Sequence, residues 1–367
     1  MRALLGCLAI GLAACPKAPP KSPSYVPPSR AAGVFDTHVH TSPRGIPTLL
    51  EIMDEAGVRY ALNLSGRWPS GPLEKQLEAA NATGRILVAT TLPWGLAGHA
   101  DDFPVICANL VLEAKRLGAR ALKIEKALGL GVTKPDGSLL KVDDPWLDPV
   151  WNAAGEAGLP VVIHTADPKA FWLPMDEKND RIEELRAHPG WSNHDVPDLP
   201  SFEELLEGLM RVVAKHPRTR FVAVHFGNNA EDPEWVARML DTHPNLYADV
   251  AARLPELGKH ESKLVRRVFL KHADRILFAT DLGVSPDGLM LGSTGKEPNR
   301  RDEVGAFFRG HWKYFETDDQ RIPSVTPIQS RGVMRGLELP EENLAKLYRE
   351  NAISLFGTPT STASKSR

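Results

Sequence analysis

The chain has 367 residues, of which 42% are hydrophobic and 25% are charged, and its formal net charge is −2. That length fits two average domains or one large barrel, and the composition is that of an ordinary globular protein. The sequence has neither a basic excess nor a block of lysine and arginine, which argues against a nucleic-acid partner.

The first residues have the features of an export signal. Met1 and Arg2 precede an apolar run, residues 3–14, which is too short to span a bilayer as a permanent helix. The run ends in Leu-Ala-Ala-Cys at residues 12–15, which resembles the lipobox of a bacterial lipoprotein. The resemblance implies that residues 1–15 are a signal peptide and that Cys15 carries a lipid anchor. We therefore expect an exported protein held on a bacterial membrane, with a plain secretory signal as the alternative.

Both ends of the remaining chain are predicted to lack a packed core. Residues 16–32 are rich in proline, serine and lysine, which predicts an extended tether, and residues 359–367 are predicted to form a disordered tail. Between them, residues 33–358 are predicted to fold as one domain. Cys107 is the only cysteine outside the leader, so no internal disulfide is expected.

Short apolar runs alternate with helical patterns throughout residues 33–358. The predicted strands are 34–40, 58–64, 85–92, 119–125, 159–164, 220–225, 245–250 and 275–281. The predicted helices are 48–56, 73–82, 104–117, 145–157, 201–215, 232–240, one that ends near 270, and 340–356. This alternation predicts an α/β fold of the (β/α)8 or TIM-barrel type. A doubly wound open sheet is the alternative, but residues 41–45 do not form the glycine-rich phosphate turn typical of it.

Two strand-to-helix connections are much longer than the others. They follow the fifth and eighth strands and comprise residues 165–200 and 282–339. Barrels elaborate the loops at the carboxyl ends of their strands, where their active sites lie. We therefore expect these two segments to form the walls of a pocket.

Histidine and aspartate occur where several predicted strands end. His38 and His40 lie on one face of the first strand, with Asp36 expected below them on that face. The fifth strand ends in His164, the sixth in His225 and the eighth in Asp281. All these side chains would reach the same rim of a barrel, and imidazole and carboxylate are ligands of zinc-like ions. The pattern predicts a metal centre.

The same pattern resembles the signature of the amidohydrolase superfamily, and the local sequence resembles its amidohydrolase-2 branch, the relatives of aminocarboxymuconate-semialdehyde decarboxylase. The matching blocks are residues 35–40, 159–167, 220–228, 275–281 and 351–357. The resemblance implies that one divalent ion, expected to be zinc, is bound by four side chains: His38, His40, His164 and Asp281. A metal site with few protein ligands keeps a position open for water and lowers its pKa.

Two residues carry most of the expected chemistry. By the resemblance, His225 binds or orients the activated water and polarises the substrate. Asp281 would be both a metal ligand and the general base that passes a proton to a leaving group. Asp36 is interpreted as support for the two histidines of the first strand.

Lys123 needs a separate explanation, because it lies in an otherwise apolar fourth strand and a buried lysine requires a partner. Three alternatives are open. It is a carboxylated lysine that bridges two metal ions, an unmodified lysine that binds a substrate carboxylate, or a structural partner of Glu125.

Three further features are expected to line the pocket. Trp172 follows the fifth strand and Arg253 follows the seventh, where a guanidinium could hold an anionic substrate. Residues 311–319 belong to the loop after the eighth strand.

The expected function is that of a metal-dependent hydrolase that acts on a C–N or C–O bond of a small molecule. A metal-dependent non-oxidative decarboxylase is the alternative on the same residues. A third hypothesis is a binding lipoprotein without catalysis.

Overall fold

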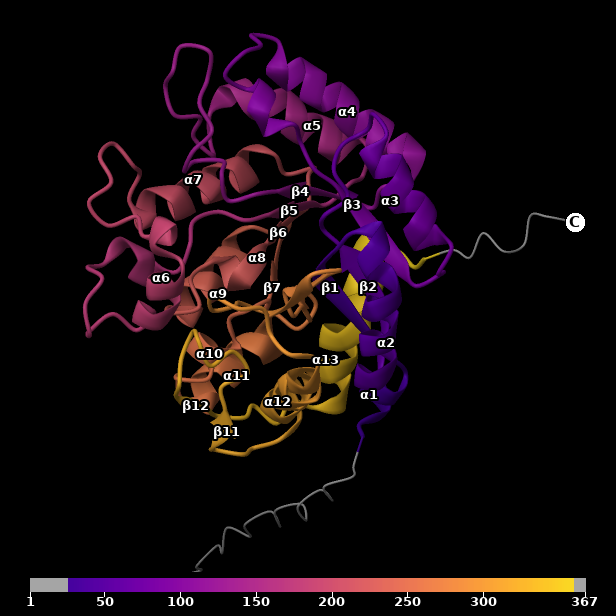
Figure 1. Ribbon diagram of the computed structural model, residues 1–367, viewed down its shortest axis with the longest axis vertical. Helices are drawn as coiled ribbons and strands as arrows, with labels where there is room; N and C mark the ends of the chain where they lie inside the picture. The colour runs from indigo at the N-terminus through magenta and orange to yellow at the C-terminus, as the bar shows by residue number, and fades with distance from the viewer. Residues whose placement is uncertain (1–25, 360–367) are drawn as a thin grey trace, which may run out of the picture.

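The computed structural model describes residues 26–359 (Figure 1). The predicted signal peptide, Cys15 and most of the tether lie outside these residues, as does most of the predicted tail. Within residues 26–359, no helix is long and apolar enough to cross a membrane.

Eight of the strands form a curled parallel sheet in chain order, and the helices lie around it (Figure 1). Their bounds are β1 (Val34–Thr41), β2 (Val58–Asn63), β3 (Ile86–Thr90), β4 (Ala121–Ile124), β5 (Val161–Ile163), β6 (Phe221–Ala223), β7 (Leu246–Asp249) and β8 (Ile276–Leu277). Backbone hydrogen bonds bring the segment after β8 back to β1: Thr37 N donates to Phe278 O at 3.1 Å, and Asp281 N donates to His38 O at 2.9 Å. The prediction of a parallel, TIM-barrel-like α/β sheet is confirmed.

The helices that follow the strands begin and end close to the predicted positions. They are α2 (Ile46–Ala56), α3 (Pro72–Asn81), α4 (Phe103–Leu117), α5 (Asp148–Glu156), α7 (Phe202–Lys215), α9 (Pro233–Thr242) and α11 (Ser262–Lys271). The predicted capping box is present at the start of α7, where Ser201 Oγ accepts from Glu204 N and Glu204 Oε2 accepts from Ser201 N. The last predicted helix is divided into α13 (Glu341–Ala345), a π-helical turn (η7, Lys346–Glu350) and α14 (Asn351–Phe356).

The core has two parts. A large cluster packs the outer side of the sheet against the helices, and a smaller one fills the inside of the sheet beside α14. Phe35 belongs to the inner cluster, whereas Val39, four residues later on the same strand, belongs to the outer one. Simple alternation would put both on one side, so β1 is irregular here, in agreement with the shift in its register with β2 between Asp36 and Val39.

The two segments predicted to be long loops contain secondary structure of their own. The segment after β5 includes η4 (Lys169–Trp172), α6 (Ile182–Ala187) and η5 (Pro189–Trp191). The segment after β8 includes β9 (Leu282–Ser285), β10 (Gly288–Leu291), η6 (Arg301–Glu303), α12 (Val304–Glu316), β11 (Ile322–Pro323) and β12 (Val333–Met334). Strand β9 pairs in parallel with the end of β1, and β10 returns along β9.

Helix α12 changes the interpretation of residues 311–319. His311 and Trp312 are buried in this helix and pack against Phe278. They belong to the outer core and do not line the cavity beside His40 that is described below, so the expectation that they line the pocket was wrong.

Candidate metal centre

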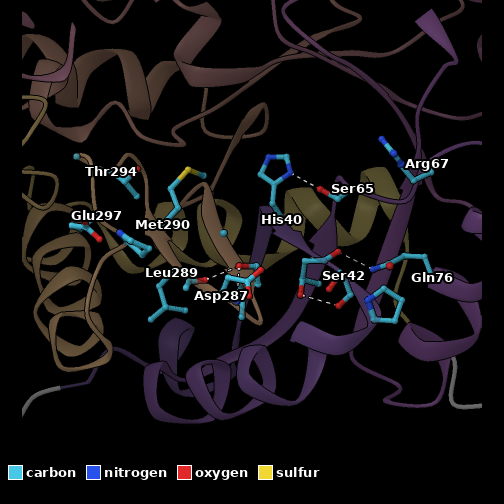
Figure 2. Close-up of a pocket in the computed structure, with 18 of the residues that line it drawn as sticks. His40, Ser42, Ser65, Arg67, Gln76, Asp287, Leu289, Met290, Thr294 and Glu297 are labelled. Atoms are coloured by element: carbon cyan, nitrogen blue, oxygen red, sulfur yellow. Dashed lines mark hydrogen bonds between the residues drawn. The ribbon is translucent and has the colours of Figure 1, made fainter. Parts of the chain in front are cut away.

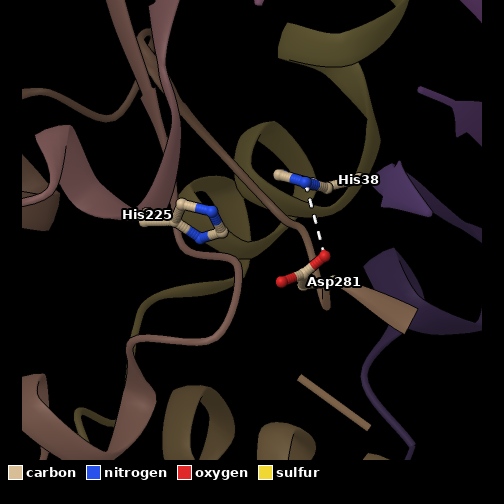
Figure 3. Close-up of side chains that lie close together, drawn as sticks. All are labelled: His38, His225 and Asp281. Atoms are coloured by element: carbon tan, nitrogen blue, oxygen red, sulfur yellow. Dashed lines mark ion pairs between the residues drawn. The ribbon is translucent and has the colours of Figure 1, made fainter. Parts of the chain in front are cut away.

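Two of the four predicted metal ligands, His38 and Asp281, converge at the carboxyl ends of the strands with His225, which was predicted to act on the activated water and was a possible further ligand. His38 comes from β1, His225 follows β6 and Asp281 follows β8, and one potential ligand atom of each lies within 4.8 Å of the others (Figure 3). Nε2 of His38 lies 3.5 Å from Asp281 Oδ1, and Nε2 of His40 lies 3.4 Å from the same oxygen. The carboxylate therefore faces two imidazoles of one strand.

His164 completes the group of histidines. Its ring centroid lies 4.4 Å from that of His225. Its Nε2 atom is buried and, among the described residues, has no hydrogen-bond partner. A buried polar atom without a partner costs free energy, whereas an imidazole nitrogen that binds a metal ion has its lone pair satisfied. This orphaned nitrogen is what a metal ligand would look like without its ion, so the residues fit a divalent cation.

The other nitrogen of each remaining histidine is held by a partner. His38 Nδ1 lies 2.9 Å from Asp249 Oδ2, His40 Nδ1 lies 2.8 Å from Ser65 Oγ, and His225 Nδ1 lies 2.9 Å from Ala251 O. Such partners fix the orientation of a metal-binding imidazole and leave Nε2 free to bind.

Asp249 was not predicted from the sequence. It is the last residue of β7, it is fully buried, and its Oδ1 accepts from the backbone N–H of His225 at 2.7 Å. The sequence does contain a signal for Asp249. It is a polar residue of a metal-binding type near the end of the seventh predicted strand, as His164, His225 and Asp281 are at the ends of the fifth, sixth and eighth.

Asp36 contacts His38, as its predicted supporting role requires, but through the backbone and not through the ring. Its Oδ1 accepts from the backbone N–H groups of His38 and Thr280, both at 3.1 Å, so it joins β1 to the segment after β8. The ring of His38 is held by Asp249. Burial raises the pKa of Asp36 to about 7, although hydrogen bonds from Thr280 and His38 oppose the shift.

Left-handed backbone conformations place several of these residues. Strand β6 ends at Ala223, and residues 225–228 then form a turn in which His225 has φ 57°, Phe226 54°, Gly227 64° and Asn228 51°. Asp281 also has a positive φ, 61°. A non-glycine residue in this region costs about 1–2 kcal/mol, and such strain is found at functional sites where the surrounding structure enforces it.

The charges of the site suit a metal ion. Burial alone would raise the pKa of Asp281, but His38, His40 and Lys123 lower it to about 2, so the carboxylate is ionised. Burial holds the pKa of His164 and of His225 well below its ordinary value, so both rings are neutral. Neutral imidazoles and an ionised carboxylate are the protonation states that bind a metal ion.

Lys123 lies inside the sheet at the base of this group. It is 3% exposed, and its Nζ atom has no hydrogen-bond partner among the described residues. Burial lowers its pKa. Glu125, the structural partner considered from the sequence, instead accepts a hydrogen bond from Trp94 Nε1 at 2.8 Å. The geometry therefore favours the two alternatives in which Lys123 meets a ligand.

Arg253 is buried beside the histidines at the start of α10 (Leu254–Leu257). It donates to Asn228 Oδ1 at 2.8 Å and to Ala252 O at 2.9 Å, while its Nε atom is buried without a hydrogen-bond partner in the described part of the chain.

Trp172 does not lie at the histidine group. Its Nε1 donates to Pro200 O at 3.0 Å and its ring packs edge-on against Phe202, so it joins the segment after β5 to the start of α7 and does not line the cavity beside His40.

A cavity of about 830 Å³ opens beside His40 (Figure 2). Its wall is formed by the end of β1, the segment between β2 and α3, and the hairpin β9–β10, with residues such as Ser65, Arg67 and Met290. His188, from the segment after β5, also lines it. Both long segments thus contribute to the wall, and the volume suits a small organic molecule.

Residues 35–358 match the family model described as amidohydrolase. No curated protein has a significantly similar sequence. Three solved structures illustrate the similarity found by structural comparison. The 2,6-dihydroxybenzoate decarboxylase from Rhizobium is 16% identical, with a TM-score of 0.46 over 88% of this chain and 98% of its own. The 5-carboxyvanillate decarboxylase from Novosphingobium aromaticivorans, complexed with manganese and a nitrobenzoic acid, is 14% identical, with a TM-score of 0.46 over 88% and 96%. A probable 2-pyrone-4,6-dicarboxylic acid hydrolase from Acinetobacter baumannii is 12% identical, with a TM-score of 0.49 over 89% and 99%.

Proposed function

The chain belongs to the amidohydrolase family, and from that membership we propose that it is a metal-dependent enzyme that removes the carboxylate group of a small organic acid. The observation that carries this proposal is the pair of buried cationic side chains, Lys123 and Arg253, each with a nitrogen that lacks a partner among the described residues. Lys123 projects from β4 to the inside of the sheet, and Arg253 follows β7 and donates to Asn228, the last residue of the turn that carries His225.

The place of these cations distinguishes a reacting carboxylate from one that only aids recognition. A carboxylate used for recognition would be held away from the chemistry, for example by an exposed cation of the cavity such as Arg67. A carboxylate held by Lys123 and Arg253 lies among the histidines. It is then the group that reacts, and its loss as CO2 is the simplest outcome.

We propose that His38, His40, His164 and Asp281 hold the ion, with His225 beside it. Three imidazoles and one carboxylate suit zinc, which we propose as the ion, with one per chain. When bound, the ion would act as a Lewis acid that polarises the oxygen atoms of the substrate.

The residues of the chain divide the remaining work. Lys123 and Arg253 bind and orient the carboxylate through charge-assisted hydrogen bonds. When the C–C bond breaks, its electron pair stays on the substrate carbon, CO2 leaves, and the carbon must take a proton. Asp281 would pass that proton from solvent to the carbon, and the buried rings of His38 and His225 would limit the access of other water.

Hydrolysis of a C–N or C–O bond is the second candidate. It is favoured by the ionised state of Asp281, because only an unprotonated carboxylate can accept a proton from water. In that reaction Asp281 would take a proton from water and pass it to the leaving group. A binding lipoprotein without catalysis is the remaining alternative, and it predicts that the purified protein holds no metal.

One experiment tests these alternatives together. The full-length protein is analysed for metal and incubated with a panel of aromatic carboxylates, esters, lactones and amides, while release of CO2 and hydrolysis are followed separately. Decarboxylation predicts release of CO2 that is lost in Asp281→Asn and kept in Asp318→Asn, a change to an exposed carboxylate on the loop after α12. Activity that survives Asp281→Asn would overturn the mechanism.

We also propose that the protein is exported and held on a bacterial membrane by a lipid on Cys15, because residues 12–15 resemble a lipobox. Cell fractionation tests this. The wild-type protein should sediment with membranes, whereas Cys15→Ser should be released in soluble form. Equal distribution of the two proteins would contradict the proposal.

A further inference from the structure

Three residues form a row across the sheet at the edge of the cavity. His40 of β1 pairs with Gly283 of β9, and Gly283 pairs with Met290 of β10. Residues paired across neighbouring strands project to the same face of a sheet. The side chains of His40 and Met290 therefore stand on one face, two strand spacings or roughly 10 Å apart at the backbone, with no side chain between them.

Gly283 is not required by its backbone conformation. It has no positive φ, so its conformation is open to any residue. What it supplies is space. A Cβ atom at this position would lie 3.1 Å from Met290 Cβ and 3.3 Å from Met290 Cε. Met290 thus folds back over the glycine and partly fills the gap beside His40.

The two walls of this gap differ in mobility. The ring of His40 is fixed by Ser65, and its side chain is 31% exposed toward the cavity. Methionine has three rotatable bonds and adapts to its surroundings, so Met290 can withdraw from Gly283 with little cost. Its thioether also makes favourable contacts with aromatic rings.

We infer that Gly283 and Met290 form a size-selecting slot beside His40, which receives a flat, ring-sized part of the substrate. The strand at Gly283 is the floor, His40 is the fixed wall and Met290 is the adjustable one. This inference rests on the proposed function, because the reacting carboxylate must lie at the metal centre for the body of the substrate to extend past His40 into the slot.

The test uses two acids that differ by one fused ring, benzoate and 2-naphthoate, and the metal-loaded full-length protein. The chain has seven methionines, so methyl-13C-methionine labelling gives a simple spectrum, in which loss of a signal in Met290→Leu assigns Met290. We expect 2-naphthoate to shift the Met290 methyl signal more than benzoate does. We expect Gly283→Val to raise the Kd of 2-naphthoate at least tenfold, with a smaller effect on benzoate.

Valine is favoured in strands but crowds Met290 Cβ, so Gly283→Ala is made beside it, and the Tm of both variants is compared with that of the wild type. The matched control is Gly131→Val, where nothing lies within 4 Å of an added Cβ and the residue is exposed. Unchanged affinity for both acids is expected there. The slot is refuted if 2-naphthoate leaves the Met290 signal unmoved, if neither acid binds, or if Gly283→Val weakens both acids equally.

The result separates the slot from the reaction. A shift of the Met290 signal in a protein that turns over neither acids nor esters would support the slot and reject the proposed function. If neither Gly283→Val nor Met290→Leu changes the release of CO2, the slot is rejected and the proposed function is kept.

Discussion

The carboxylate of Asp249 lies 2.9 Å from the Nδ1 atom of His38, and both side chains are 1% exposed. The other oxygen of the same carboxylate accepts from the backbone N–H of His225. One buried group at the end of β7 thus orients a histidine of β1 and fixes the turn that carries another. Metal-binding imidazoles owe their orientation to partners of this kind.

We expect Asp249→Asn to weaken metal binding about 10- to 100-fold, the usual effect of losing such a partner. The amide keeps the shape of the carboxylate but lacks its charge, so the fold should be retained. Competition with a coloured chelator measures the affinity, and Asp318→Asn is the matched control. Equal metal affinity in the two variants would show that Asp249 only holds the backbone of His225 and does not orient His38 for metal binding.

His164 provides a prediction that separates stability from metal binding. Because its Nε2 atom is buried without a hydrogen-bond partner among the described residues, with only Asp167 Oδ1 nearby at 3.9 Å, His164→Leu removes an unsatisfied polar atom, and the metal-free protein should lose little stability. Metal at about 100 times its Kd should stabilise the wild-type protein by about 2.7 kcal/mol.

Thermal unfolding with and without zinc measures both effects. The wild type should show a higher Tm with zinc, and His164→Leu should show a much smaller increase. A full increase in the variant would exclude His164 from the ligand set.

Much of the metal centre followed from local sequence. His38, His40, His164, His225 and Asp281 were found because each ends a predicted strand, and parallel strands bring their ends to one rim. Met290 was not found, because β9 and β10 are short strands within a segment that reads as a loop. Strand β9 pairs with β10 and with β1, and β1 lies more than 240 residues earlier in the chain. The left-handed turn at His225 was also missed, since Gly227 and Asn228 favour a positive φ but His225 and Phe226, which also adopt it, do not.

Lys123 gives a third prediction. Lys123→Met keeps the length of the side chain and removes a buried ammonium group that has no hydrogen-bond partner in the described structure, so the free energy of unfolding should change little. If Lys123 binds the substrate carboxylate, its loss removes a charge-assisted hydrogen bond worth about 1.5–3 kcal/mol, or roughly ten- to a hundredfold in kcat/KM.

The number of bound metal ions distinguishes the two ligand roles of Lys123. One ion per chain in both the wild type and Lys123→Met agrees with carboxylate binding. Two ions in the wild type and fewer in the variant would show that a carboxylated Lys123 bridges two metals.

His311 predicts a dependence of stability on pH that is separate from the metal centre. The ring is buried in α12 among Phe307 and Phe278, and burial lowers its pKa to about 4. In the unfolded chain its pKa returns to about 6.5, so as the pH falls the unfolded state takes up the proton first. The contribution of His311 to stability is therefore complete above pH 6.5 and is lost as the pH falls toward 4. At pH 5 the loss is about 2 kcal/mol.

Urea unfolding at pH 7 and pH 5 measures this loss. The wild type should lose about 2 kcal/mol more than His311→Leu, because the other buried histidines titrate in both proteins. Equal losses in the two proteins would mean that the ring takes up a proton without unfolding.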